Sequence, residues 1–205
     1  MINGVPVNNT LVSNAAKVTN IGFEAELTAR PIPHLTLSAN TGYVHPKYDS
    51  FIDATGTDVR NQRIIFVPRW TYALSAQYEH ELSDRVSFTG SVDYSWTDTF
   101  AADRCVATGP VSCWTSTAVD MNGLTAAQIG QNIVDATTIK AAGIFNARLT
   151  FGLDDDNYRL SLWGRNLTDN RDPFQATYLN ANPRNYVGGY IRDPATYGAT
   201  VAVRF

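Results

Sequence analysis

The sequence is poor in charge, and it has no long apolar segment. Only 17% of its residues are charged, against roughly 25% in an ordinary soluble domain. The net charge of −3 at pH 7 provides no basic surface of the kind that nucleic-acid binding requires. The longest uninterrupted apolar run is about Ile64 to Val67, far short of the roughly 20 residues of a membrane-spanning helix. These absences argue against nucleic acid as a partner and against transmembrane helices.

Residue patterns that carry catalysis or hold cofactors are also missing. No Gly-rich phosphate loop, nucleophile elbow or paired-carboxylate pattern occurs. His34, His45 and His80 lie in a turn, at a strand end and near another turn, without a spacing that would gather them on one metal ion. The acidic run 154–156 lacks the Gly and the distant Glu of a calcium-binding loop. We therefore predict that the protein is not an enzyme and has no cofactor.

The chain has two cysteines, Cys105 and Cys113, eight residues apart in a segment rich in Gly, Thr and Ser. This spacing favours a local disulfide in an oxidising compartment. A metal site is disfavoured because no His lies near them. Two free thiols in a loop are the alternative.

The main positive signal is an alternation of apolar and polar residues with period two, which places successive side chains on opposite faces of a strand. It recurs in seven runs, and Trp163 is the one residue that does not fit its run. A tilted strand needs roughly 9–11 residues to cross a bilayer, whereas soluble strands usually have about five or six. The predicted strands are long enough to cross, at approximately 18–31, 35–48, 69–82, 86–99, 144–153, 158–167 and 197–205.

The connections between the runs alternate in length. They are short after the first, third and fifth runs, and long at 49–68, 100–143 and 168–196. Outer-membrane barrels show this asymmetry, with short periplasmic turns and long external loops. The segment 100–143 is our candidate region for ligand contact, since recognition residues concentrate on such loops, and residues 124–129 within it favour a short helix.

The apolar faces of all seven runs are free of charge, which fixes their register. A slip of one residue in the first run would move Glu24, Glu26 and Arg30 into lipid, where Lys or Arg costs roughly 2–4 kcal/mol at mid-bilayer and acidic residues somewhat less. The polar faces would then line a lumen. The charged candidates for lumen-facing positions are Glu24, Glu26, Asp93, Arg148, Arg165 and Arg204.

A soluble β-sandwich is the alternative to a membrane sheet, because its strands alternate too. It would have shorter strands and more long charged side chains on its solvent faces. The sequence instead favours an all-β antiparallel meander of about seven long transmembrane strands. In isolation this meander would form an open, curled sheet with two unpaired, aggregation-prone edges.

Three stretches resemble a known family. Asn20 to Leu27 resembles a strand that follows an external loop in the TonB-dependent receptors, Leu160 to Asp169 their penultimate strand with its "NLTD" loop, and Tyr197 to Phe205 their closing strand. The resemblance implies a 22-stranded, plugged barrel. Residues 1–205 would be a partial barrel domain, the C-terminal third of the whole, with the plug domain absent.

The resemblance also implies a function. The family takes up a scarce ligand, such as an iron-siderophore, cobalamin or a glycan, across the bacterial outer membrane. The expected partners are the lipid bilayer, a small-molecule ligand and the inner-membrane TonB energy complex, the last reached through the missing plug. Met1 to Pro6 lack the features of a signal peptide, so an exported protein would have lost its front.

A structural or adhesive outer-membrane barrel that folds alone is the alternative function. An odd number of strands argues against it, since single-chain bacterial barrels have an even number. The last strand resembles the signal by which the barrel assembly machinery recognises its clients. The carriers of this signal would be Tyr197, Val201, Val203 and Phe205.

Overall fold

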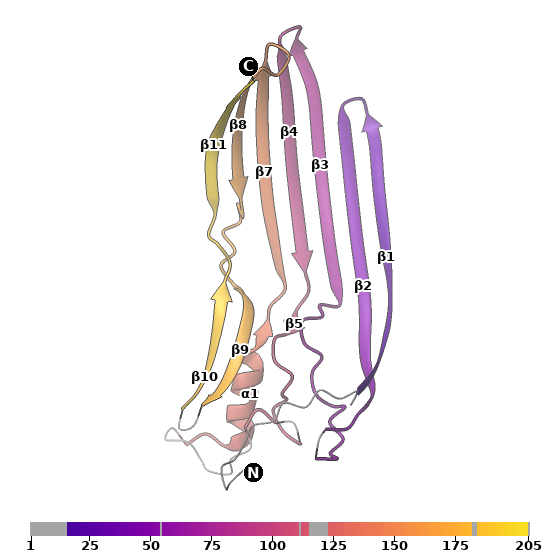
Figure 1. Cartoon of the computed structure of the whole chain (residues 1–205), viewed down its shortest axis with the longest axis vertical. Helices are drawn as coiled ribbons and strands as arrows, with labels where there is room; N and C mark the ends of the chain where they lie inside the picture. Colours follow the sequence, from indigo (N-terminus) through magenta and orange to yellow (C-terminus); the bar gives the residue numbers. More distant parts are fainter. Residues whose placement is uncertain (1–15, 54, 111, 115–122, 182–183, 205) are drawn as a thin grey trace, which may run out of the picture.

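One antiparallel sheet of seven strands dominates the structure, a computed structural model that describes residues 16–53, 55–110, 112–114, 123–181 and 184–204. The strands lie in the order β1-β2-β3-β4-β7-β8-β11, with β1 and β11 at the two open edges (Figure 1). The predicted open all-β meander is therefore confirmed. Their bounds are β1 (Ala16–Ile32), β2 (Leu35–Phe51), β3 (Trp70–Ser83), β4 (Val86–Thr97), β7 (Ala142–Leu153), β8 (Tyr158–Arg165) and β11 (Thr196–Val203).

Short turns join neighbouring strands at one end of the sheet, the upper end in Figure 1. In the turn between β7 and β8, Asp154, Asp155 and Asp156 all have positive φ angles, of 51°, 51° and 64°. Asp adopts this left-handed region more readily than most residues. The run of three aspartates therefore makes a tight turn, as its composition predicts.

The register of the sheet places apolar side chains in rows across one face. Leu27 pairs with Ala39, Ala39 with Leu74, Leu74 with Tyr94, and Tyr94 with Phe145. Leu27 is 64% exposed and Leu74 is 47% exposed. No second sheet of the described residues covers this face, so the arrangement is not the β-sandwich that was the alternative.

The buried hydrophobic residues lie toward the other end of the molecule, where the long connections are. This end carries β5 (Phe100–Ala101), β6 (Thr138–Ile139), the helix α1 (Ala126–Ala136) and the hairpin of β9 (Pro173–Ala181) and β10 (Arg184–Ile191). Ala102, Ile139 and Ala176 form one buried cluster there, with exposures of 6%, 2% and 3%. The long segments therefore fold together into a compact cap at one end of the sheet.

The cap adds detail to two local predictions. The segment 168–196, predicted as a long connection, contains the antiparallel pair of β9 and β10. The helix runs from Ala126 to Ala136 rather than over the predicted 124–129, and it begins with a capping box in which Thr125 and Gln128 bond to each other's backbone N–H groups. Within the part of the chain that the structure describes, no helix is both long and apolar enough to span a membrane.

Candidate functional site

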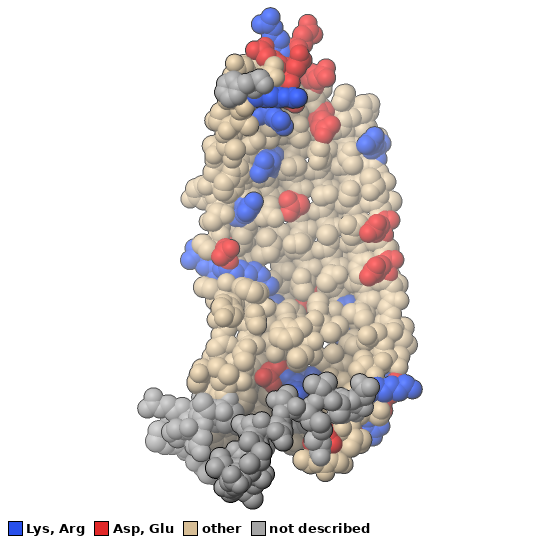
Figure 2. All heavy atoms as spheres, in the orientation of Figure 1, with Lys and Arg blue, Asp and Glu red and all other residues tan. Residues whose placement is uncertain are grey.

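The polar face of the sheet carries charged side chains of both signs. Figure 2 shows acidic groups over β1 and near the middle of the sheet, several basic groups over the half that contains β7, β8 and β11, and a basic group over the β1 edge as well. By strand alternation, Glu24 and Glu26 of β1 and Asp93 of β4 lie on the face opposite the apolar rows. Arg148 and Arg165 lie on the same polar face in β7 and β8, and Arg204 follows β11.

Within the described residues, no hydrogen bond or ion pair joins two of these six predicted residues, although two of them contact other side chains. Asp93 accepts a hydrogen bond of 2.6 Å from Nδ2 of Asn146, its neighbour on β7. The guanidinium of Arg165 lies 5.6 Å from the centre of the Trp163 ring, within the range of a cation–π contact. Glu24 and Glu26 lie opposite Gly42 and Asn40 on β2, far across the sheet from the arginines.

Trp163, which does not fit the alternation, has a place on this polar face. Its Nε1 donates a hydrogen bond of 3.2 Å to Oγ1 of Thr200 on β11. Gly198 lies directly opposite it in the register, and a Cβ at that position would come within 2.7 Å of the Trp163 ring. The large ring is therefore accommodated because its cross-strand partner is glycine.

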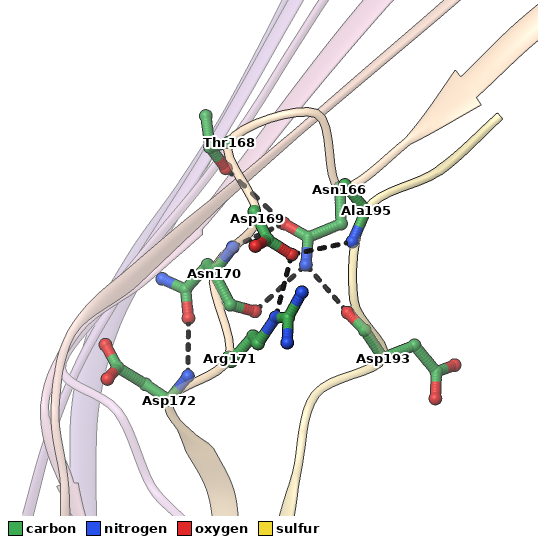
Figure 3. A network of polar contacts seen from close by, with 8 residues as sticks. All are labelled: Asn166, Thr168, Asp169, Asn170, Arg171, Asp172, Asp193 and Ala195. Carbon is green, nitrogen blue, oxygen red and sulfur yellow. Dashed lines mark hydrogen bonds and ion pairs between the residues drawn. The ribbon is translucent and has the colours of Figure 1, made fainter.

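Where β8 ends, a polar junction joins it to the cap (Figure 3). Asn166 has a φ of 47° and is 6% exposed. Its Nδ2 donates to the backbone oxygens of Asn170, at 2.9 Å, and Asp193, at 2.8 Å. Its Oδ1 accepts from the backbone N–H of Asn170, at 3.0 Å. One buried amide thus holds both the turn after β8 and the chain that returns from β10.

Asp169 makes the second half of this junction. Its Oδ1 accepts from the backbone N–H of Ala195 at 2.9 Å and from Nε of Arg171 at 3.0 Å. The hydrogen bond from Arg171, followed by that from Ala195, lowers the pKa of the Asp169 carboxyl below its ordinary value. The family resemblance seen in the sequence includes the NLTD stretch. It does not predict that Asp169 bonds to Ala195, 26 residues away, or that Asn166 bonds to Asp193, 27 residues away.

The region 100–143, predicted for ligand contact, is organised by a disulfide. Cys105 and Cys113 are bonded, with their Cα atoms 4.9 Å apart. Both are buried against Ile133 of α1, and partly buried Tyr178 of β9 and Val187 of β10 pack on the same cluster. The disulfide therefore connects the helix and the β9–β10 hairpin in one small core.

The remaining predicted residues lie on the last strand. On β11, Tyr197 is 80% exposed and Val201 is 72% exposed, because the strand pairs only with β8. Val203 is the last residue of the strand and is also exposed. Phe205 lies outside the described residues. Across the described ranges, no group of three or more His, Cys, Asp and Glu side chains could hold a metal ion.

Comparisons with known proteins agree with this architecture. A family model described as "TonB dependent receptor-like, beta-barrel" matches residues 1–167. The fold is similar to that of FyuA, the ferric yersiniabactin uptake receptor from Yersinia pestis, with a TM-score of 0.64 and 16% identity, over 92% of this chain and 24% of that one. It is also similar to BauA, the ferric preacinetobactin receptor from Acinetobacter baumannii, with a TM-score of 0.55 and 14% identity, over 92% and 22%. The chain thus spans about a quarter of the length of these two receptors.

Proposed function

The chain belongs to the TonB-dependent receptor-like β-barrel family, and on this premise we propose that it serves as the C-terminal barrel segment of an energy-coupled receptor in the bacterial outer membrane. The observation that carries the proposal is the apolar face of the sheet. Rows of exposed apolar side chains without a charge cross the seven strands of the sheet, which is the pattern of a lipid-facing barrel wall.

In this proposal the two faces and the two ends of the sheet have different roles. The apolar face contacts lipid, and the polar face, with Glu24, Glu26, Asp93, Arg148 and Arg165, faces the lumen and the plug of the complete receptor. The short turns point to the periplasm, and the cap points outward, where it contacts the ligand. Coupling to the inner-membrane TonB complex takes place through the plug rather than through this segment.

The transported ligand belongs to the iron-siderophore, cobalamin or glycan class. The two receptors named above take up or bind ferric compounds. Ferric chelates are therefore the first ligands whose binding should be tested. Insertion depends on the barrel assembly machinery, which reads Tyr197, Val201, Val203 and Phe205 on the closing strand. The segment binds and encloses a ligand, and it catalyses no reaction.

The membrane orientation is tested with tryptophan fluorescence and brominated lipids. Trp96 lies on the apolar face at the cap end of β4, and Trp163 lies on the polar face of β8. Two single-tryptophan variants, made by replacing the other three tryptophans with Phe, are refolded into vesicles whose acyl chains carry bromine near the headgroup. We expect strong quenching of Trp96 and little quenching of Trp163.

The comparison of the two variants provides its own control, because each chain has one tryptophan on one face. Equal quenching of both residues would overturn the assignment of the faces. A stable, monodisperse monomer in buffer without lipid or detergent would overturn the membrane location itself.

A further inference from the structure

Two histidines that are far apart in the sequence meet at the turn end of the sheet. His34 lies in the turn between β1 and β2, and His80 lies near the end of β3. Their ring centres are 5.4 Å apart, and the ring planes make an angle of 76°. The ring of Tyr78 completes a triangle, at 6.4 Å from the ring of His34 and 6.0 Å from that of His80. The spacing of the histidines in the sequence did not predict this pair.

The backbone holds these two histidines side by side. The N–H of Glu79 donates a hydrogen bond of 2.9 Å to the backbone oxygen of His34, so His34 is bonded to the residue that precedes His80. His34 has a φ of 70°, a left-handed conformation that His adopts more readily than most residues. The turn therefore departs from strand geometry at His34, and the imidazole lies beside Tyr78 and His80. The approach of the two rings thus follows from how the β1–β2 turn is bonded to β3.

Both imidazoles are exposed, and their nitrogens have no polar partner. Within the part of the chain that the structure describes, neither ring forms a hydrogen bond or an ion pair. The torsion about the Cβ–Cγ bond of His has a broad minimum, so each ring can turn a nitrogen toward the other without a change in the backbone. Cys105 and Cys113 are bonded to each other, so no thiolate of this chain competes for a metal ion. The nitrogens of His34 and His80 are therefore available as ligands.

The separation of the rings fits two ligands of one transition-metal ion. Neutral imidazole is the commonest metal ligand in proteins, and it suits zinc, copper and nickel ions. Two imidazoles on a tetrahedral Zn²⁺, with Zn–N bonds of about 2.0–2.1 Å, have their ring centres roughly 5 Å apart. The rings of His34 and His80 are 5.4 Å apart, so an ion between them requires only a small adjustment of the side chains.

We propose that His34 and His80 together bind one Zn²⁺ or a chemically similar transition-metal ion. No third His, Cys, Asp or Glu of the described residues joins them, so water fills the remaining positions around the ion. The ion links the β1–β2 turn to β3, and it therefore stabilises the pairing of β2 with β3 at this end of the sheet. This site lies at the end opposite the cap, and it goes beyond the proposed function because it does not involve the transported ligand.

The test uses Zn²⁺ as the probe and Mg²⁺ as the comparison ion. The full 205-residue chain is refolded in a nonionic detergent with its disulfide intact, and binding is measured by isothermal titration calorimetry. We expect saturable binding of one Zn²⁺ per chain and no binding of Mg²⁺, which prefers oxygen ligands. In NMR spectra, the imidazole signals of His34 and His80 should shift as Zn²⁺ is added, and those of His45 should not. Zn²⁺ should also raise the midpoint of unfolding in guanidinium, because an ion that binds the folded chain stabilises it.

Two substitutions each remove one ligand and keep the local structure. His34→Asn retains a residue that tolerates the left-handed conformation, and His80→Phe retains an aromatic ring beside Tyr78. Each should weaken Zn²⁺ binding by roughly tenfold or more, since even the loss of a group that only supports a metal-bound His has an effect of that size. His45→Ala is the matched control, because it removes a histidine of β2 that pairs with Ile21, far from the turn. Zn²⁺ affinity should not change in this variant.

An unchanged Zn²⁺ affinity in His34→Asn and His80→Phe would overturn the proposal, as would the absence of saturable Zn²⁺ binding in the parent chain. Equally tight binding of Mg²⁺ would point to carboxylate ligands and would also contradict it. A loss of Zn²⁺ affinity in His45→Ala as large as that in His34→Asn would show that the ion is not held at the β1–β2 turn. The quenching of Trp96 by brominated lipid does not depend on Zn²⁺, so a failure of this site leaves the membrane assignment in place.

Discussion

The side-chain amide of Asn166 donates a hydrogen bond of 2.8 Å to the backbone oxygen of Asp193, 27 residues further along the chain. This bond joins the end of β8 to the segment that leads into β11, the next strand of the sheet. The whole β9–β10 hairpin lies between the two residues. A single buried amide therefore fixes where the hairpin leaves the sheet and where it returns.

Asn166→Asp should loosen this junction. The carboxylate keeps the size of the amide and its acceptor oxygens, but it loses both donors and faces two backbone oxygens instead. We expect the free energy of unfolding to fall by about 1–3 kcal/mol, with faster amide hydrogen exchange at Ala195 and in β9 and β10. The measurement is hydrogen exchange together with denaturant unfolding in detergent micelles.

Asn170→Asp is the control for that variant. The side-chain oxygen of Asn170 accepts a hydrogen bond from the backbone N–H of Asp172, and a carboxylate still accepts it. This change should leave exchange at Ala195 nearly as it is. If both variants alter exchange equally, added negative charge rather than the lost donors of Asn166 explains the effect.

The lipid-facing assignment predicts a difference between adjacent residues of β3. Leu74→Arg places a cation in the apolar row between Ala39 and Tyr94, which costs about 2–4 kcal/mol near mid-bilayer. Ser75→Arg places the same residue on the polar face, opposite Asp93, where the charges attract. Unfolding of the vesicle-inserted chain in guanidinium should show a large loss for the first variant and little for the second. Equal losses would contradict the assignment.

The seven-stranded sheet was predictable because each of its strands has an apolar face and a polar face along its length. Leu27, Ala39 and Leu74 occupy one row of an uncharged face, so a period of two in the sequence is enough to identify both the strand and its register. Short turns at one end then make each hairpin antiparallel. These local signals do not require any knowledge of distant contacts.

The cap was predicted poorly because its strands and helix obtain their environment from one another. Ala176 of β9 is buried only because Ala102 and Ile139, from a different long segment, pack against it. The partners of Asn166 lie just as far away in the sequence.

The Asp169 carboxylate should give the junction a pH dependence at acid pH. Its pKa in the folded chain is lowered, mainly by the hydrogen bond from Arg171, below the ordinary value of 3.8. Because the pKa is lowered in the folded chain, the contribution of this carboxylate to the stability of the junction is complete above pH 3.8. It is lost as the pH falls through the pKa of the folded state. An NMR titration of the Ala195 amide should therefore show its midpoint below 3.8.

Arg171→Gln tests the cause of that shift. Removing the guanidinium should move the midpoint upward toward 3.8, and added salt should do the same to a smaller extent because the pair is exposed. Asp169→Asn should abolish the transition at Ala195. A midpoint at or above 3.8 in the parent chain would contradict the predicted lowering.

Reduction of the disulfide should affect the cap and spare the sheet. The bond closes a short loop, for which the chain-entropy estimate is about 2–3 kcal/mol, and both sulfurs pack on Ile133 of α1. Loss of the bond should therefore release α1 and the 105–113 segment, whereas β2, β3 and β4 are held by their own ladders. Gly130 of α1 lies too close to the backbone oxygen of Ala107 for a side chain to fit, so Gly130→Ala should loosen the same contact without reduction.

Hydrogen exchange with and without reductant measures both effects in the same chain. Amides of α1 should exchange faster after reduction, and those of β2 to β4 should keep their protection. A Cys105→Ser/Cys113→Ser variant should match the reduced parent and show no further change with reductant. Because the cap residues bury their apolar groups among themselves rather than against the sheet, loss of protection in β3 on reduction would mean that the two parts fold as one unit, contrary to this prediction.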